Sequence, residues 1–541
     1  MRPLLLLFIS FNICIQLNAQ VFSSSNLPVI SIQTNGQQII DEPKITADMG
    51  IVFNSNNARN NLTDPFNHYN GKIGIEIRGQ SSQQFPMKSY SIELWDNTGN
   101  SLDKSLFGLP KESDWVLYAP YNDKTLMRNF LAYTMSREMG RWAANCRYVE
   151  LFINNEYKGI YVFMEKIKRN SGRVNIPKLS TADITGDAVT GGYIFSIDKE
   201  ADAWYSNYPL NSASLNKKIH FSYVYPKITS IVTEQRNYIK SYVDSFENAI
   251  ASDQFRDTVI GWRKYADESS FIDYLIVNEL SHNVDAYRLS SYFYKDKASK
   301  GGKIIAGPVW DYDLAFRNAN YCNGSNTDGW VYDFNRICPD DFWQIPFWWS
   351  QFASDPGFQF KLRCRWKELR QTSLSVTRIN NLIDSVAQLT SEARERHFQK
   401  WPVLGQYIWP NPQPIATTYT TEIEYLKAWI QARITWLDEN MPNEGPCLDY
   451  PLTKNESFIT TGLPNPVQSV YTVTIKSKMK QQIQIRGVDL AGRILYTKMM
   501  ELNNGFNQVQ INMNNWQTGI YILFFKTDDG TTTQLKVLKS L

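Results

Sequence analysis

The sequence is poor in the residues that build metal and thiol sites. Of its 541 residues only six are cysteine and four are histidine, and no Cys-x-x-Cys pair occurs, so a structural zinc site is not expected. No Gly-x-Ser-x-Gly motif is present and no cysteine lies in a setting typical of a nucleophile, which leaves serine and thiol hydrolase chemistry without support. The formal net charge is only +3, so no overall field favours a nucleic acid or a membrane surface.

Long apolar runs are also missing, except at the start of the chain. Residues 1–20 combine Arg2, about a dozen mostly apolar residues and the small residue Ala19, which is typical of a signal peptide cleaved after Ala19 or one residue later. No later stretch reaches about 18 apolar residues, so no transmembrane helix is predicted. The sequence therefore predicts an exported protein.

Export permits disulfide bonds, and the cysteine spacing favours one pair. Five cysteines remain once Cys14 leaves with the signal peptide. Cys322 and Cys338 flank a polar loop rich in Gly and Asn and form the most plausible pair. Because the remaining number is odd, at least one cysteine stays unpaired unless two chains are cross-linked.

Hydrophobic periodicity divides the chain into two parts. The first combines period-two strands, such as 73–77, with helices, such as 126–139. After a predicted linker at 447–462, short alternating strands separated by Gly- and Asn-containing turns continue to the end. This pattern predicts an α+β region over residues 21–446 and a small all-β sandwich over residues 463–541.

Acidic residues near the ends of predicted elements form the strongest candidate site. The segment SHNVDAY contains Asp285, and the later motif Trp310-Asp311-Tyr312-Asp313 supplies two more aspartates. Mg²⁺ in proteins is commonly held by one or two carboxylates with waters and phosphate oxygens, and a separate aspartate can accept the proton of a hydroxyl nucleophile. The alternative is a simple turn in which the aspartates bind local amides, and spacing alone favours that alternative.

A second candidate is the turn Arg78-Gly79-Gln80-Ser81-Ser82 between two strands, followed by Lys88. A polar turn with a glycine can cover phosphates, and a lysine on the next strand can reach them. Neither common phosphate-loop motif is present, so these residues alone favour an ordinary hairpin with an exposed lysine. Glu165, which precedes Lys166, could flank a nucleotide cleft or form a solvated ion pair.

Taken together, these segments resemble the CotH (spore coat protein H) kinase family over about residues 28–441. The resemblance is carried by many segments in the same order, namely Ile77 to Ser82, Phe85-Pro86-Met87-Lys88-Ser89-Tyr90, Asp114-Trp115-Val116-Leu117, Asp123 to Asn129, Val149-Glu150-Leu151, Glu165-Lys166-Ile167, Gly192-Tyr193-Ile194, Asn283-Val284-Asp285 and Trp310 to Asp313. So many ordered segments argue against a chance match.

The resemblance implies a divergent protein-kinase-like fold with a small lobe over about 28–200 and a large lobe over about 201–446. By analogy, Asp285 is the catalytic-loop aspartate, and Asp311, with Asp313 beside it, binds the metal. The nucleotide-binding residues implied are Lys88, which would meet the α- and β-phosphates, the covering loop with Arg78, Gly79 and Ser81, and Glu165. The usual HRD and DFG motifs are absent, as they generally are in this family.

The implied reaction moves the γ-phosphoryl group of ATP, with Mg²⁺ or Mn²⁺, to Ser or Thr of an exported or cell-surface protein. Such a reaction asks the protein mainly for positioning and charge neutralisation. ATP is scarce outside the cytoplasm, so action during export or another phosphoryl donor remains open. The alternative hypothesis is a surface structural or carbohydrate-binding protein with an inactive kinase-like domain, to which the 14% of aromatic residues would contribute ligand-binding faces.

The C-terminal region resembles the sorting domain of the type IX secretion system of Bacteroidetes-like bacteria. The segments that carry this resemblance are Pro464-Asn465-Pro466, Leu490-Ala491-Gly492-Arg493, Gly519-Ile520-Tyr521 and the basic end Lys536 to Lys539. It implies the type IX secretion machinery as a partner and a place outside the cell or at the outer membrane or cell surface. The strands alone also fit a generic adhesion sandwich.

Overall fold

The computed structural model describes residues 22–541 except for gaps at 56–57, 200–202, 210–217, 444–446, 448–457 and 490–491 and at residues 464, 478, 529 and 541. The chain divides into two compact units, Met1–Glu444 and Gly445–Leu541. The predicted signal peptide lies outside the described residues. Every helix in the described part of the chain is too short or too polar to span a bilayer.

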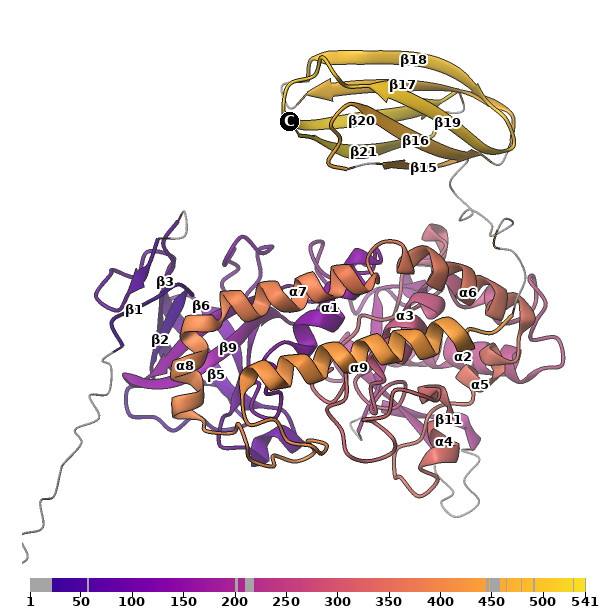
Figure 1. Ribbon diagram of the computed structural model, residues 1–541. Coiled ribbons are helices and arrows are strands. Elements are labelled where there is room, and N and C mark those ends of the chain that lie inside the picture. Colours follow the sequence, from indigo (N-terminus) through magenta and orange to yellow (C-terminus); the bar gives the residue numbers. More distant parts are fainter. Residues whose placement is uncertain are drawn as a thin grey trace, which may run out of the picture. The chain divides into compact units, whose positions relative to one another are not determined.

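The first unit begins with a closed barrel (Figure 1), in which the strands follow the order β2-β3-β5-β6-β7-β9-β8. Period-two alternation builds it, because Ile73 and Ile75 on β5 and Ile92 on β6 point inward and are completely buried. A parallel pairing of β2 with β8, in which Val29 faces Glu150, closes the ring. The barrel strands are β2 (Val29–Gln33), β3 (Ile45–Val52), β5 (Tyr69–Arg78), β6 (Ser89–Trp95), β7 (Asp114–Tyr118), β8 (Cys146–Ile153) and β9 (Glu156–Glu165), and the short pair β1 (Ser24–Ser25) and β4 (Asn60–Asn61) lies apart from this ring.

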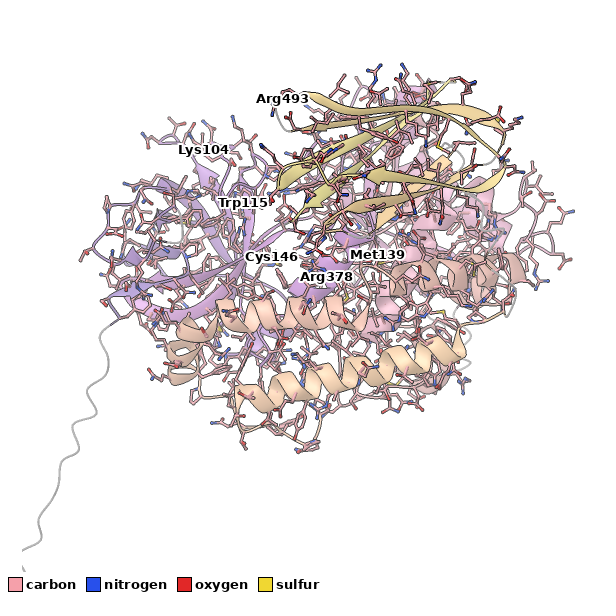
Figure 2. The ribbon with its side chains drawn as sticks, turned by 45° about the horizontal axis from the view of Figure 1, so that its top comes forward. Lys104, Trp115, Met139, Cys146, Arg378 and Arg493 are labelled. Atoms are coloured by element: carbon pink, nitrogen blue, oxygen red, sulfur yellow. A yellow bond between two sulfur atoms is a disulfide. The ribbon has the colours of Figure 1, made fainter. Side chains whose placement is uncertain are left out.

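Aromatic side chains fill the barrel interior. Trp115 on β7, labelled in Figure 2, is completely buried, and its ring stacks on Phe163 of β9 at a centroid distance of 5.0 Å. The guanidinium of Arg173 lies 4.8 Å from the Trp115 ring. These aromatic residues are therefore part of the core, which is the commoner use of such side chains.

A five-stranded antiparallel sheet and the helices form the rest of the first unit. The sheet has the order β11-β12-β10-β13-β14 and shares one hydrophobic core with the helices. Helix α9 lies beside α3 and α7 (Figure 1). The sheet strands are β10 (Tyr193–Ile197), β11 (Ala203–Pro209), β12 (Lys218–Tyr225), β13 (Ser291–Lys295) and β14 (Ile304–Ala306). The helices are α1 (Arg128–Glu138), α2 (Thr233–Ala251), α3 (Glu268–Ser281), α4 (Phe334–Ile337), α5 (Trp348–Ala353), α6 (Pro356–Arg370), α7 (Val376–Leu389), α8 (Ser391–Lys400) and α9 (Tyr419–Asn440).

The second unit is an all-β sandwich, as predicted, with one sheet ordered β15-β16-β19 and the other β18-β17-β20-β21. Alternating residues such as Val473 and Ile475 of β16 fill the space between the sheets. Strand β15 begins at Phe458, inside the range expected to be a linker, and pairs with β16. The strands are β15 (Phe458–Leu463), β16 (Val470–Ser477), β17 (Gln481–Asp489), β18 (Ile494–Leu502), β19 (Gly505–Asn512), β20 (Gly519–Thr527) and β21 (Thr532–Lys539).

The predicted disulfide between Cys322 and Cys338 is confirmed, with a Cα–Cα distance of 5.7 Å. Cys364 and Cys447 are also disulfide-bonded. Cys146, labelled in Figure 2, is a free thiol, so the expected unpaired cysteine is present too. Burial raises the pKa of the Cys146 thiol to about 12, which makes it a poor nucleophile at neutral pH.

One buried carboxyl of α2 makes stability depend on pH. Glu247 accepts hydrogen bonds from Ser206 Oγ at 2.8 Å and Trp348 Nε1 at 3.0 Å, and burial raises its pKa from 4.5 to about 7. Between those two values the folded state keeps a proton that the unfolded state has released. The free energy of unfolding should therefore fall as pH rises through this window, by up to about 1.4 kcal/mol per pH unit.

Glu247→Gln is expected to remove this pH dependence, because glutamine preserves the shape and can satisfy both partners without a charge. Urea unfolding at pH 5 and pH 8 measures the effect, and the variant should be the more stable protein at pH 8. The exposed Glu424→Gln on α9 is the control and should keep the wild-type slope. Identical slopes in the wild type and Glu247→Gln would contradict the assignment.

Candidate active site

A cavity of about 310 Å³ brings together residues from the barrel, from α1 and from loops next to the five-stranded sheet. Its volume lies at the lower end of the range of small-molecule sites, which is about 300–1,000 Å³. Most of the residues predicted for the site line this cavity: Arg78, Gly79, Ser81, Asp285, Asp311 and Asp313. Residues more than 200 positions apart in the sequence thus meet in one place.

The loop after β5 is shaped by Gly79. Its φ of +96° is unfavourable for other residues, and a Cβ atom there would lie 2.1 Å from Ser82 Oγ. The Gly79 carbonyl accepts a hydrogen bond from Gln83 Nε2 at 2.6 Å, which closes the loop. The glycine therefore permits a compact turn over the cavity.

Two buried donors in the cavity wall have no hydrogen-bond partner within the described part of the chain. The guanidinium of Arg78 lies 5.5 Å from the centroid of the Trp310 ring, and among the described residues its Nη1 has no hydrogen-bond partner. The Tyr118 hydroxyl also lines the cavity, and the described residues supply no partner for it either. An unsatisfied buried donor costs roughly 1–3 kcal/mol, and more if it is charged. Such donors indicate that an acceptor-rich ligand completes the site.

Helix α1 and the segment before it hold the acidic turn in the cavity wall. Tyr133 Oη accepts a hydrogen bond from Asp311 N at 3.1 Å, and Asn129 Oδ1 accepts one from Tyr312 N at 2.6 Å. Asn122 Nδ2 donates to Asp313 Oδ2 at 2.8 Å. Asp311 has a φ of +67°, a strained conformation that often accompanies functional sites. In the described structure neither aspartate side chain caps a local amide, as a simple turn would require.

The carboxyl groups in this cavity repel one another. Burial and the charge of Asp311 raise the pKa of Asp313 well above its usual range. Burial also raises the pKa of Asp285, with the charge of Arg288 opposing the effect. The pKa of Asp198, at the end of β10, is raised to about 6, again mainly by burial. A cation in the cavity would relieve this repulsion.

The donor set fits a hard divalent cation that retains other ligands. Asp311 and Asp313 are carboxylates on one turn, and Mg²⁺ is usually bound through one or two carboxylates with waters and phosphate oxygens. The described residues contain no cluster of three or more His, Cys, Asp or Glu side chains that could hold a metal ion on their own. Any metal here would therefore need further oxygen atoms, from water, from a ligand or from carbonyl groups of the protein.

Lys88 and Glu165 do not line the cavity. Lys88 Nζ donates to the carbonyl oxygen of Gln83, so its charge anchors the covering loop from outside. The side chain of Glu165 is completely buried and accepts hydrogen bonds from Asn145 N at 2.9 Å and Asn145 Nδ2 at 2.8 Å. Of the two basic residues that flank this loop, Arg78 lines the cavity and Lys88 does not.

Sequence reasoning missed Asp198, Lys199 and Trp409, all of which line the cavity. Asp198 directly follows the buried strand β10, and an acidic residue after a buried strand was a usable signal. Trp409 lies in a proline-rich loop, stacks on Tyr321 and is 44% exposed. Its position depends on the packing of distant segments, for which the sequence holds no local signal.

A buried ionic network fixes the segment that follows the acidic turn. Arg128, at the start of α1, forms ion pairs with Asp123 and, at 3.3 Å, with Glu422 of α9. Arg128 Nε also donates to the carbonyl oxygens of Ala315 at 3.1 Å and Phe316 at 3.3 Å. The network therefore ties α1 and α9 to the backbone just beyond Asp313.

Comparisons with known proteins match both units of the chain to family models. Residues 75–437 match the family model described as CotH kinase protein, and residues 463–539 match the secretion system C-terminal sorting domain. The inner spore coat protein H of Bacillus subtilis (strain 168) is 23% identical over 245 residues, which cover 45% of this chain and 59% of that protein. A β-glucosidase structure from Listeria innocua, solved with glucose, matches only 16% of each chain, at 16% identity with a TM-score of 0.13, and carries no argument.

The sorting domain indicates a secreted or cell-surface protein that uses the type IX secretion machinery. The kinase family model covers most of the first unit, including every predicted residue that lines the cavity. With two thirds of its length matched by that model, the chain belongs to the CotH kinase protein family.

Proposed function

We propose that this protein is a secreted atypical kinase that transfers the γ-phosphoryl group of ATP to Ser or Thr of exported or surface proteins. The observation that carries the proposal is the pairing, in one cavity, of Arg78, whose buried Nη1 has no hydrogen-bond partner among the described residues, with the acidic group Asp285, Asp311 and Asp313. A phosphate chain would accept hydrogen bonds from Arg78, and the metal ion bound to it would be held by the aspartates. The barrel would then form the small lobe of a divergent protein-kinase-like fold, and the helical region the large lobe.

Each residue has a distinct role in this proposal. Arg78 and the backbone of the Gly79–Ser82 loop bind phosphate oxygens, while Lys88 fixes the loop through Gln83. Asp311 and Asp313 hold Mg²⁺ or Mn²⁺, which supplies charge neutralisation at the phosphates when bound.

Asp285 acts on the acceptor. It takes the proton of the acceptor hydroxyl as the oxygen of that hydroxyl bonds to the γ-phosphorus. The bond from the γ-phosphorus to the β,γ-bridging oxygen breaks in the same step, and ADP leaves.

A surface-binding protein with an inactive kinase-like domain is the second candidate. Two observations favour it: the Lys88 amine is engaged outside the cavity, and Trp409 presents an exposed aromatic face at its edge. Aromatic faces of this kind commonly bind apolar or sugar ligands.

The deciding experiment is to measure ATP binding by calorimetry and γ-phosphate transfer with the purified protein, with Mg²⁺, with Mn²⁺ and with chelator. Metal-dependent binding and transfer to the protein itself or to a secreted protein fraction support the kinase. Absence of both nucleotide binding and transfer would reject it in favour of the surface-binding candidate.

Gly79→Ala is expected to weaken ATP binding roughly tenfold, because the positive φ and the contact with Ser82 Oγ together correspond to about 1–2 kcal/mol of strain in the loop. Titration calorimetry measures the change. Adding Ser82→Ala removes the contact but not the φ strain and should restore only part of the affinity. Unchanged affinity in Gly79→Ala would show that the loop does not meet the nucleotide.

A further inference from the structure

One buried arginine holds the side chain of Asp285. The Arg288 side chain is only 2% exposed, and its Nη2 donates to Asp285 Oδ1 at 2.7 Å. Its Nη1 donates to Asp341 Oδ1 at 3.1 Å, and its Nε to the carbonyl oxygen of Val284 at 3.0 Å. The guanidinium lies 4.1 Å from the centroid of the Phe334 ring. Arg288 therefore has a fixed position set from several sides.

This arrangement leaves Asp285 with one committed oxygen and one available oxygen. Oδ1 is bound to Arg288, whereas Oδ2 has no hydrogen-bond partner among the described residues. The side chain of Asp285 is 23% exposed and lines the cavity. A carboxylate fixed through one oxygen presents the other in a defined direction, which is what proton transfer from a positioned hydroxyl requires.

The partners of Arg288 are in turn held by a disulfide. Asp341 N donates to the Cys338 carbonyl at 3.2 Å, and Cys338 N donates to the Phe334 carbonyl at 2.7 Å. Cys338 is bonded to Cys322. Phe334, which contacts the guanidinium, lies within the loop that this disulfide closes. Asp341 lies just after that loop and is hydrogen-bonded to Cys338.

The other end of the disulfide also lies near the site. Cys322 follows Tyr321, and burial together with the charge of Asp285 raises the pKa of the Tyr321 hydroxyl. Tyr321 stacks on Trp409, which lines the cavity. The single bond between Cys322 and Cys338 thus joins two chain segments that approach Asp285.

We propose that Arg288 is a positioning residue for Asp285 and that the Cys322–Cys338 disulfide keeps it in place, so that phosphoryl transfer requires the oxidised protein. The inference rests on the proposed kinase function. A dithiol supplies the two electrons and two protons that convert the disulfide into two thiols, and the dithiol becomes a cyclic disulfide. The segment 322–338 then loses its closure, and Arg288 loses two of its fixed neighbours. The enzyme would be weak in a reducing cytoplasm and active after export.

The test measures kcat, the KM for ATP and ATP affinity on the full chain with Mg²⁺. Arg288→Met and Asp341→Asn should lower kcat, by roughly 100-fold and tenfold, because misplacing a catalytic group by about 1 Å can cost 10²-fold. The affinity for ATP should change less than about twofold, since neither residue lines the cavity. Arg288→Lys, which keeps the charge but not the fork, should recover only part of kcat.

The disulfide is tested separately. Dithiothreitol and the double variant Cys322→Ser/Cys338→Ser should each lower kcat roughly tenfold without loss of ATP binding. Because Cys364 and Cys447 are also disulfide-bonded, Cys364→Ser/Cys447→Ser serves as a control and should keep its sensitivity to dithiothreitol. Arg336→Gln, an exposed arginine in the same segment, should have the wild-type kcat.

The outcomes separate two failures. An oxidised wild type that neither binds ATP nor transfers phosphate rejects the kinase function and this inference with it. An active wild type whose kcat is unchanged in Arg288→Met, or whose kcat and ATP affinity fall together, rejects only the positioning role. Full activity of Cys322→Ser/Cys338→Ser rejects the redox requirement.

Discussion

Asp285→Asn is expected to lower kcat for phosphoryl transfer by roughly 10³-fold, within the range of about 10²–10⁴ that general acid–base groups contribute. Asparagine preserves the contact with Arg288 but cannot take the proton of the acceptor hydroxyl. The affinity for ATP with Mg²⁺ should stay close to that of the wild type, because the phosphates and the metal contact other residues. Single-turnover transfer and titration calorimetry on the same preparation measure both quantities.

Asp311→Asn is the second variant, and it should affect ATP binding as well as phosphoryl transfer. It removes a proposed metal ligand, so both transfer and the Mg²⁺-dependent part of ATP binding should be lost. Asp253→Asn, at an exposed aspartate that does not line the cavity, is the matched control and should behave as the wild type. If Asp285→Asn and Asp311→Asn both keep wild-type transfer, the cavity is not a kinase site.

Arg128→Met should destabilise the protein by about 3–5 kcal/mol, the range found when one partner of a buried ion pair is removed. The side chains of Arg128 and Asp123 are each 1% exposed and that of Glu422 is 6% exposed, so two buried carboxyls would lose their cation. Denaturant unfolding measures the loss. Phosphoryl transfer by the variant should also fall, even without denaturant and at a temperature well below that of its thermal unfolding. The reason is that the carbonyls of Ala315 and Phe316 lose their hydrogen-bond donor.

A matched control is available on the surface. Arg378 (Figure 2) pairs with Glu138, and their side chains are 43% and 25% exposed. Arg378→Met should cost no more than about 1 kcal/mol, as is typical of exposed pairs. Equal destabilisation by Arg128→Met and Arg378→Met would show that the buried network contributes no more to the free energy of unfolding than an exposed ion pair.

Much of the local structure could be predicted from the sequence because periodicity is a local property. The alternation of Ile73, Ile75 and Ile77 identified β5, and the short alternating strands expected after the linker occur in the second unit. The acidic motif around Asp311 was recognisable for the same reason, since its four residues are consecutive in the chain. Closure of the barrel was not predicted, because the pairing of β2 with β8 joins distant strands in parallel.

Which of the two basic residues beside the covering loop lines the cavity could not be identified from local sequence patterns. Arg78 and Lys88 flank the same turn, and the resemblance implied that both bind the nucleotide, with Lys88 meeting the α- and β-phosphates. In the structure Arg78 ends β5 and lines the cavity, whereas Lys88 bends back to the Gln83 carbonyl. That difference depends on three-dimensional packing around Trp310, which lies over 200 residues later.

The parallel pairing that closes the barrel also sets the order of events when the chain is made. Val29 of β2 faces Glu150 of β8, so the parallel partner of β2 is synthesised about 120 residues after β2 itself. At about 5–20 residues per second, that delay lasts on the order of ten seconds. During this interval β2 can pair with β3, but its other edge has no partner, so the ring cannot close. The ring therefore closes only after β8 and β9 have been made, and one edge of β2 stays open until then.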